Sequence, residues 1–92
     1  MKAIHKFLLE PNTSSVYMPQ GAAILHVHMQ GGMPAIWALV DVDSKPYKLR
    51  HFHIAGTGQP IPEEIDELMT PLYIGTVHQE PFVWHVFEVS KP

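Results

Sequence analysis

The sequence contains no cysteine and few charged residues. Without cysteine the chain can form no disulfide bond, no thiolate metal site and no cysteine nucleophile. Lys, Arg, Asp and Glu make up 16% of its 92 residues, which is below the roughly 25% that is usual in soluble domains. Six Lys and Arg stand against nine Asp and Glu, for a formal charge of −3, and the basic residues form no stripe. We therefore expect no nucleic-acid partner.

Long hydrophobic runs are also missing. No apolar run approaches the roughly 18 residues of a membrane span. The segment Met1–Lys6 lacks the apolar stretch of a signal peptide. We therefore expect no membrane partner and a location in a reducing cytoplasm, with which the lack of cysteine agrees.

Alternating apolar and polar residues, separated by turn residues every 8 to 12 positions or so, are what the sequence does contain. This pattern predicts a single β domain over 1–92. Its fold class is all-β: a small antiparallel barrel or sandwich of six to seven strands, with at most one short helix at Pro62–Leu68. The expected strands are Lys2–Leu9, Ser14–Met18, Ala22–Gln30, Met33–Asp41, Tyr47–Ala55, Leu72–His78 and Phe82–Val89. The pair Gly31-Gly32 predicts a two-residue hairpin turn, because both central positions of the favoured turn need φ > 0.

The run Met33–Asp41 is apolar on both faces of the predicted strand. This is typical of a central strand that is covered on both sides. We therefore expect Trp37 to be buried, in the core or against another subunit. A chain this short has a modest core, so its remaining apolar surface and strand edges predict a homo-oligomer.

Two His-x-His dyads lie in predicted strands: His26 with His28, and His51 with His53. Strand side chains alternate between faces, so each dyad puts both imidazoles on one face, roughly 6.5 Å apart. A metal site on neighbouring strands is one interpretation, with these four residues as ligands. The other is ordinary surface and core histidines. Nothing in the sequence requires the two strands to meet, so we expect no stoichiometric transition metal and no cofactor.

The end of the run Tyr47–Ala55 is the place where a small anionic ligand would bind. Arg50 offers a planar cationic fork for phosphate or carboxylate, and the backbone of Thr57 and Gly58 can add N–H donors. His51 and His53 lie on the same strand and complete the candidate ligand-binding set. The alternative is an exposed arginine beside a strand-ending turn. No catalytic residue is predicted, because no nucleophile motif is present.

Several blocks in a fixed order carry a resemblance over nearly the whole chain: Met1-Lys2, Met18–Ala22, Ile24-Leu25, Trp37–Asp41, Gly56–Ile61, Tyr73–Thr76 and Val83–Glu88. In these blocks the chain resembles a family of short, uncharacterised proteins, labelled as a domain of unknown function, that tailed bacteriophages and prophages encode. The resemblance implies a phage origin and a place in the host cytoplasm. It implies no activity and no catalytic residue, and the histidine dyads lie outside the blocks.

Three functions remain open from the sequence. The first is a non-enzymatic phage accessory protein that binds, and thereby sequesters, a nucleotide signal or a host defence protein. This expectation rests on the genomic context in which small phage proteins are found, and not on any residue of this chain. The second is a small metal-binding protein or metalloenzyme that uses the His-x-His dyads. The third is a minor structural or assembly protein of the virion.

Overall fold

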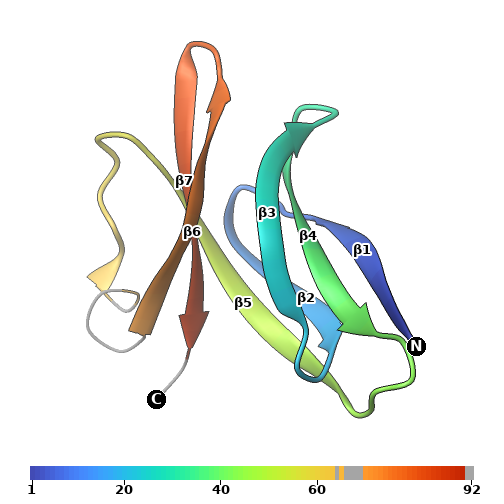
Figure 1. Ribbon diagram of the computed structural model, residues 1–92. Coiled ribbons are helices and arrows are strands. Elements are labelled where there is room, and N and C mark those ends of the chain that lie inside the picture. The colour runs from blue at the N-terminus through green and yellow to red at the C-terminus, as the bar shows by residue number, and fades with distance from the viewer. Residues whose placement is uncertain (64, 66–69, 91–92) are drawn as a thin grey trace.

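Seven β-strands make up most of the described chain, which in this computed structural model comprises residues 1–63, 65 and 70–90 (Figure 1). They are β1 (Lys2–Leu8), β2 (Asn12–Pro19), β3 (Ala23–Gln30), β4 (Met33–Asp41), β5 (Tyr47–Gly56), β6 (Thr70–Gln79) and β7 (Phe82–Ser90). The prediction of an all-β fold is confirmed. The predicted helix at 62–68 includes residues 64 and 66–68, which lie outside the described residues. No helix of the described part is long and apolar enough to cross a membrane.

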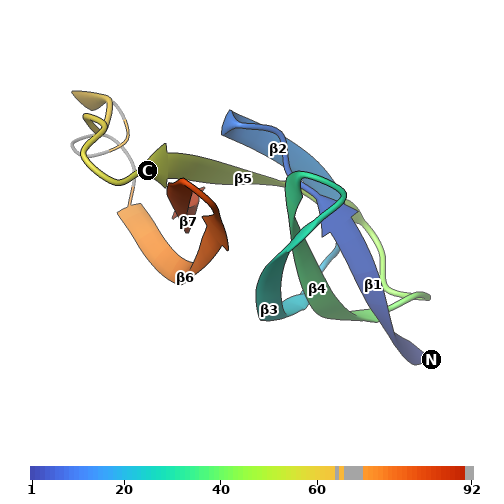
Figure 2. The same cartoon turned by 90° about the horizontal axis from the view of Figure 1, so that it is seen from above.

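The strands form two antiparallel sheets in a sandwich-like arrangement. One sheet has the order β1-β4-β3, and the other has the order β2-β5-β7-β6. Strand β5 joins the edge strand β2 to the rest of the larger sheet, because its residues 47–54 pair with β2 and its residues 51–56 pair with β7. Seen from above, β5 accordingly reaches from β7 at one end to β2 at the other (Figure 2).

The edge strands β3 and β6 lie side by side and run in the same direction, but they belong to different sheets (Figure 1). The structure therefore resolves the choice between barrel and sandwich in favour of the sandwich. It leaves a seam between β3 and β6 where the two sheets meet without a shared hydrogen-bond ladder.

The core lies between the sheets and comes from alternate residues, as period-two patterning requires. From β4 it takes Ile36, Ala38 and Val40, and from β5 it takes Phe52 and Ile54. All five are at most 2% exposed. The predicted alternation of β5 is thus confirmed on its inner face. At Gly31 and Gly32, which join β3 to β4, φ is 58° and 81°. Both values are positive, as the predicted two-residue hairpin turn requires.

The outer face of β4 differs from the prediction, because it is only partly covered. Trp37 is partly exposed and lies between Lys6 of β1 and His26 of β3 in the pairing register. Its ring centroid is 5.8 Å from that of His26. Burial of Trp37 in the core, one of the two predicted alternatives, is therefore wrong, and its burial against another subunit stays a prediction. The outer face of β4 is apolar because β4 is the middle strand of its sheet, between β1 and β3. No second layer of the described chain covers that face completely.

A β-bulge in β3 also overturns the predicted faces of that strand. The pairing with β4 shifts register between Ile24 and His26, which leaves Leu25 as the extra residue. Ile24 and Val27 both pack against the core, whereas Leu25 and His26 are both exposed. Strict alternation placed Ile24 with His26, and the bulge separates them because an extra residue reverses the side-chain phase.

Candidate functional site

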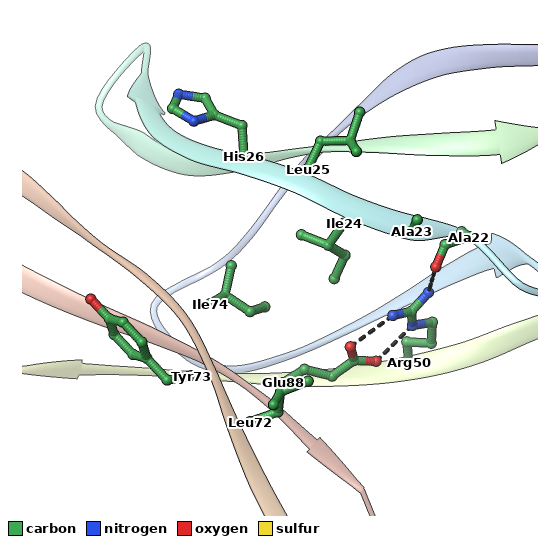
Figure 3. Close-up of a pocket in the computed structure, with 10 residues that line it drawn as sticks. All are labelled: Ala22, Ala23, Ile24, Leu25, His26, Arg50, Leu72, Tyr73, Ile74 and Glu88. Atoms are coloured by element: carbon green, nitrogen blue, oxygen red, sulfur yellow. Dashed lines mark hydrogen bonds and ion pairs between the residues drawn. The ribbon is translucent and has the colours of Figure 1, made fainter.

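A cleft of about 300 Å³ opens at the seam between the first half of β3 and the first half of β6 (Figure 3). One wall comes from β3 and the residue before it, and the other comes from β6, with the side chains of Ile24 and Ile74 pointing into the cleft from opposite sides. Its lining consists of Ala22, Ala23, Ile24, Leu25, His26, Arg50, Leu72, Tyr73, Ile74 and Glu88. Apart from His26 and the hydroxyl of Tyr73, the wall side chains are apolar, and the two charged residues lie on the floor.

Two bulges shape this cleft, one in each wall. The register of β3 shifts at Leu25, and the register of β6 shifts at Ile74. Bulges are common at sheet edges and beside active sites, because the extra residue interrupts the ladder and redirects side chains. Here the two bulges face each other across the seam, so neither edge offers a regular ladder along the cleft.

Gly75 closes the seam beyond the cleft. A Cβ atom at this position would lie 2.6 Å from Cγ1 of Val27. Only glycine therefore lets β6 approach β3 so closely without displacing a side chain. The strands meet at Val27 and Gly75, and the space between Ile24 and Leu72 remains open.

The floor of the cleft is an ion pair between Arg50 of β5 and Glu88 of β7. Arg50 Nε donates to Glu88 Oε2 at 2.6 Å, and Arg50 Nη2 donates to Glu88 Oε1 at 2.7 Å. Arg50 Nη1 donates to the carbonyl oxygen of Ala22 at 2.5 Å. The two side chains are 23% and 16% exposed. This geometry is the bidentate fork that arginine forms with a carboxylate, and it leaves the floor without net charge.

The sequence predicts that Arg50 binds an anionic ligand, but Glu88 already occupies the guanidinium group in this way. Arg50 also lies far from the other predicted donors. Thr57 is seven positions further along the chain, which corresponds to roughly 23 Å in an extended strand. Of the five predicted binding residues, only Arg50 lines this cleft. Its role toward a ligand stays a prediction.

The other four predicted binding residues lie in different surroundings. His51 Nδ1 is 2.8 Å from Oγ of Ser15 on the neighbouring strand β2. His53 is 5% exposed and lines an apolar hollow with Ile61 and Phe87. Thr57 and Gly58 follow β5, and φ at Gly58 is 85°. The structure therefore spreads the predicted set over several sites instead of gathering it at one, and the binding role of these four also stays a prediction.

The two His-x-His dyads lie on different sheets. The rings of His26 and His28 stack on β3, with centroids 6.0 Å apart. His51 and His53 belong to β5. Within residues 1–63, 65 and 70–90, no three His, Asp or Glu side chains gather closely enough to hold a metal ion. The strands thus do not bring the four proposed ligands together. The expectation that the protein binds no stoichiometric transition metal stays a prediction.

A hydrogen-bonded chain of side chains that the sequence analysis missed connects the turn after β5 to β6 and β7. Thr57 Oγ1 is 2.7 Å from His85 Nε2, and His85 Nδ1 is 3.1 Å from Thr76 Oγ1. Thr76 Oγ1 is in turn 2.6 Å from the hydroxyl of Tyr73. The bulge at Ile74 brings Tyr73 and Thr76, three positions apart, to one face. Hydroxyl groups can donate or accept, so both ring nitrogens of His85 are satisfied in either tautomer.

Glu88 is the other residue that the sequence analysis missed. One signal was available: an acidic residue at an inward position of an apolar strand, in phase with Val86. Acidic side chains are seldom buried unless they are paired, so Glu88 required a cation across the sheet. The sequence offered no means to choose Arg50 among six basic residues.

Comparison with known proteins yields one match. No curated protein and no solved structure is significantly similar to this chain. A family model, described as Domain of unknown function (DUF7352), matches residues 1–92. The protein with the bulged cleft and the Arg50–Glu88 floor therefore belongs to the DUF7352 family.

Proposed function

We propose that this protein is a non-enzymatic accessory protein of a tailed bacteriophage or prophage, which acts in the host cytoplasm by binding a host protein. The resemblance of its sequence blocks to short phage proteins supports the origin. The cleft between β3 and β6 supports the mode of action, and it is the observation that carries the proposal. In it, a large side chain of the partner would insert between the two bulged edges.

The residues in and around the cleft favour the binding of a partner protein. Around the opening, Leu25, Leu72 and Tyr73 are 54%, 65% and 57% exposed. Exposed apolar and aromatic side chains that gather at a concave site are typical of the centre of a protein-interaction surface, whose periphery is polar. The volume of about 300 Å³ lies at the lower end of the range for small-molecule pockets, and it suits one anchoring side chain at the centre of an interface.

A nucleotide signal fits this cleft less well than a protein. Its phosphates would need cationic groups, but Glu88 holds two of the three guanidinium nitrogens of Arg50, and Ala22 holds the third. The net charge of −3 also disfavours a polyanionic ligand. The same ion pair supports a non-enzymatic role, because each charged group of the floor is already engaged by the other.

Capture of partners from infected cells tests the proposal. The tagged wild-type protein is compared with Leu72→Asp at the cleft and Tyr17→Asp on β2, since Leu72 and Tyr17 are 65% and 64% exposed. Both variants place a carboxylate at an exposed strand position, so both should keep the fold, which circular dichroism checks. Cross-linked partners are quantified by mass spectrometry. We expect Leu72→Asp to reduce recovery of one host protein about tenfold or more, whereas Tyr17→Asp leaves it unchanged.

Equal recovery of every partner by all three proteins would contradict the proposal. So would native mass spectra in which the wild type retains a nucleotide and Leu72→Asp does not, because the cleft would then take a small molecule. Recovery only in purified virions would favour the structural alternative.

A further inference from the structure

A second hollow, of about 340 Å³, lies between the turn that follows β5 and the turn that joins β6 to β7. Its lining includes Thr57, Gln59, Pro81, Phe82 and Trp84. None of its lining residues also lines the cleft between β3 and β6. The hollow is therefore a separate candidate site.

Two stacked aromatic rings form one wall of this hollow. The ring centroids of Phe82 and Trp84 are 5.6 Å apart, with 26° between the ring planes. Trp84 is held in place because its Nε1 donates to Gln79 Oε1 at 3.0 Å, and Gln79 Nε2 donates to the carbonyl oxygen of Gly32 at 3.3 Å. Phe82 remains 55% exposed although it lies against Trp84. The wall is thus a fixed aromatic platform with an open end.

Gly56 makes room for both the platform and the polar side of the hollow. A Cβ atom there would lie 3.2 Å from Trp84 Cζ3 and 3.0 Å from Gln59 Cδ. In the space that glycine leaves, Gln59 Oε1 accepts a hydrogen bond from the backbone N–H of Gly56 at 2.9 Å. That bond orients the amide. The Nε2 group of Gln59 is left as a donor without a partner in the described part of the chain.

Charge narrows the choice of ligand. The lining consists of Gly56, Thr57, Gln59, Pro81, Phe82, Val83 and Trp84, none of which carries a charge. An open aromatic face favours a planar ring that continues the stack. An oriented amide N–H₂ beside that face can donate a hydrogen bond to an acceptor on the edge of the ring. The lining holds no cation. The backbone N–H of Thr57 is already bonded to the carbonyl oxygen of Val83 at 3.1 Å, so a phosphate or a carboxylate would have no charged partner in this hollow.

We propose that this hollow binds an uncharged planar heteroaromatic ring, which stacks on Phe82 and accepts a hydrogen bond from Gln59. A nucleoside base has this chemistry. The site is distinct from the protein-binding cleft and does not depend on it.

Titration of the ¹⁵N-labelled protein with adenosine, observed by NMR, tests the proposal. We expect shifts in the Trp84 indole N–H, the Gln59 side-chain amide and the backbone N–H of Thr57. Phe82→Ala should weaken binding roughly tenfold, since stacking on an aromatic side chain accounts for much of the affinity for a base. Gln59→Leu should also weaken binding. Tyr47→Ala is the matched control, because Tyr47 is an exposed aromatic residue, 49% exposed, that lies outside the hollow.

Three results would overturn the proposal. One is the lack of any shift with millimolar adenosine. Another is equal affinity of the wild type and Phe82→Ala. The third is binding of adenosine monophosphate that is tenfold or more tighter than binding of adenosine, because the site would then recognise phosphate. Equal affinity for both ligands, lost in Phe82→Ala and kept in Tyr47→Ala, would support the proposal.

Discussion

Arg50 and Glu88 are 38 positions apart in the sequence, and yet the cleft depends on their contact. A partly buried ion pair of this kind adds less to stability than its short distances suggest, because both charges lose hydration. Removing one partner is more costly than removing both, since the remaining charge is then left partly buried without its counter-charge.

A double-mutant cycle on this pair gives the first prediction. We expect Glu88→Leu to lower the free energy of unfolding by about 2–4 kcal/mol, as for a charge that loses its partner at a partly buried site. The double variant Arg50→Met with Glu88→Leu should recover part of that loss, because no charge remains. Urea unfolding measures both. A double variant less stable than Glu88→Leu alone would contradict this account.

Asp41 gives a prediction about pH at the same scale. The backbone N–H of Asp43 donates to Asp41 Oδ1 at 3.1 Å, and the N-terminal ammonium group of Met1 lies 3.2 Å from the same oxygen. Both interactions favour the carboxylate and lower the pKa of Asp41 below its ordinary value. Because its pKa is depressed in the folded state, its contribution to stability is present above the ordinary pKa. That contribution is lost as the pH falls through the folded-state pKa.

We therefore expect an NMR titration to give Asp41 a pKa below that of an unfolded Asp. The variant Asp41→Asn should lose less stability than the wild type between pH 5 and pH 2. Equal loss over this range would show that the interaction does not persist in solution.

At the scale of the element, β3 and β6 meet where a glycine faces a branched side chain. Valine has little freedom at χ1, so Val27 cannot readily move away from a new Cβ atom at position 75. We expect Gly75→Ala to destabilise the protein by about 1–3 kcal/mol, the usual cost of overpacking. Adding Val27→Ala should cancel part of the effect in a double-mutant cycle measured by urea unfolding. Strictly additive losses would contradict the contact.

Strand β4 has two faces with different burial, and this difference predicts unequal effects of truncation. Ile36 is fully buried on the inner face of β4, so Ile36→Ala should cost about 2–5 kcal/mol. Trp37 lies on the partly exposed outer face, so Trp37→Ala should cost only about 1–2 kcal/mol. Denaturant unfolding of both variants checks the order. Equal losses would show that another subunit covers Trp37 in solution.

At the scale of the whole molecule, much apolar surface remains exposed. The described residues include eleven large hydrophobic side chains of which at least 41% is exposed. Symmetric association is the common way to cover such surface. We therefore expect sedimentation at micromolar concentration to show more than one subunit. A single species of 10.4 kDa would contradict this prediction.

The sequence by itself determined the strands and the class of fold. Residues such as Phe52 and Ile54 alternate with polar neighbours, Gly31-Gly32 marks a hairpin, and both signals are local in the chain. For the same reason the sequence placed Phe52 and Ile54 on one face of β5, and both lie in the core. Alternation failed in β3, because the extra residue of a bulge has no clear local signature.

Only the tertiary structure decided which strands become neighbours, and with them the candidate sites. The Arg50–Glu88 pair, the approach of Gly75 to Val27 and the stack of Phe82 and Trp84 beside Gly56 all join different strands. Sequence patterning cannot specify these contacts, because alternation assigns a side chain to a face but not to a partner on that face. Strand order in the two sheets settled the partners, since it placed β5 beside β7 and left β3 and β6 as bulged edges that meet without pairing.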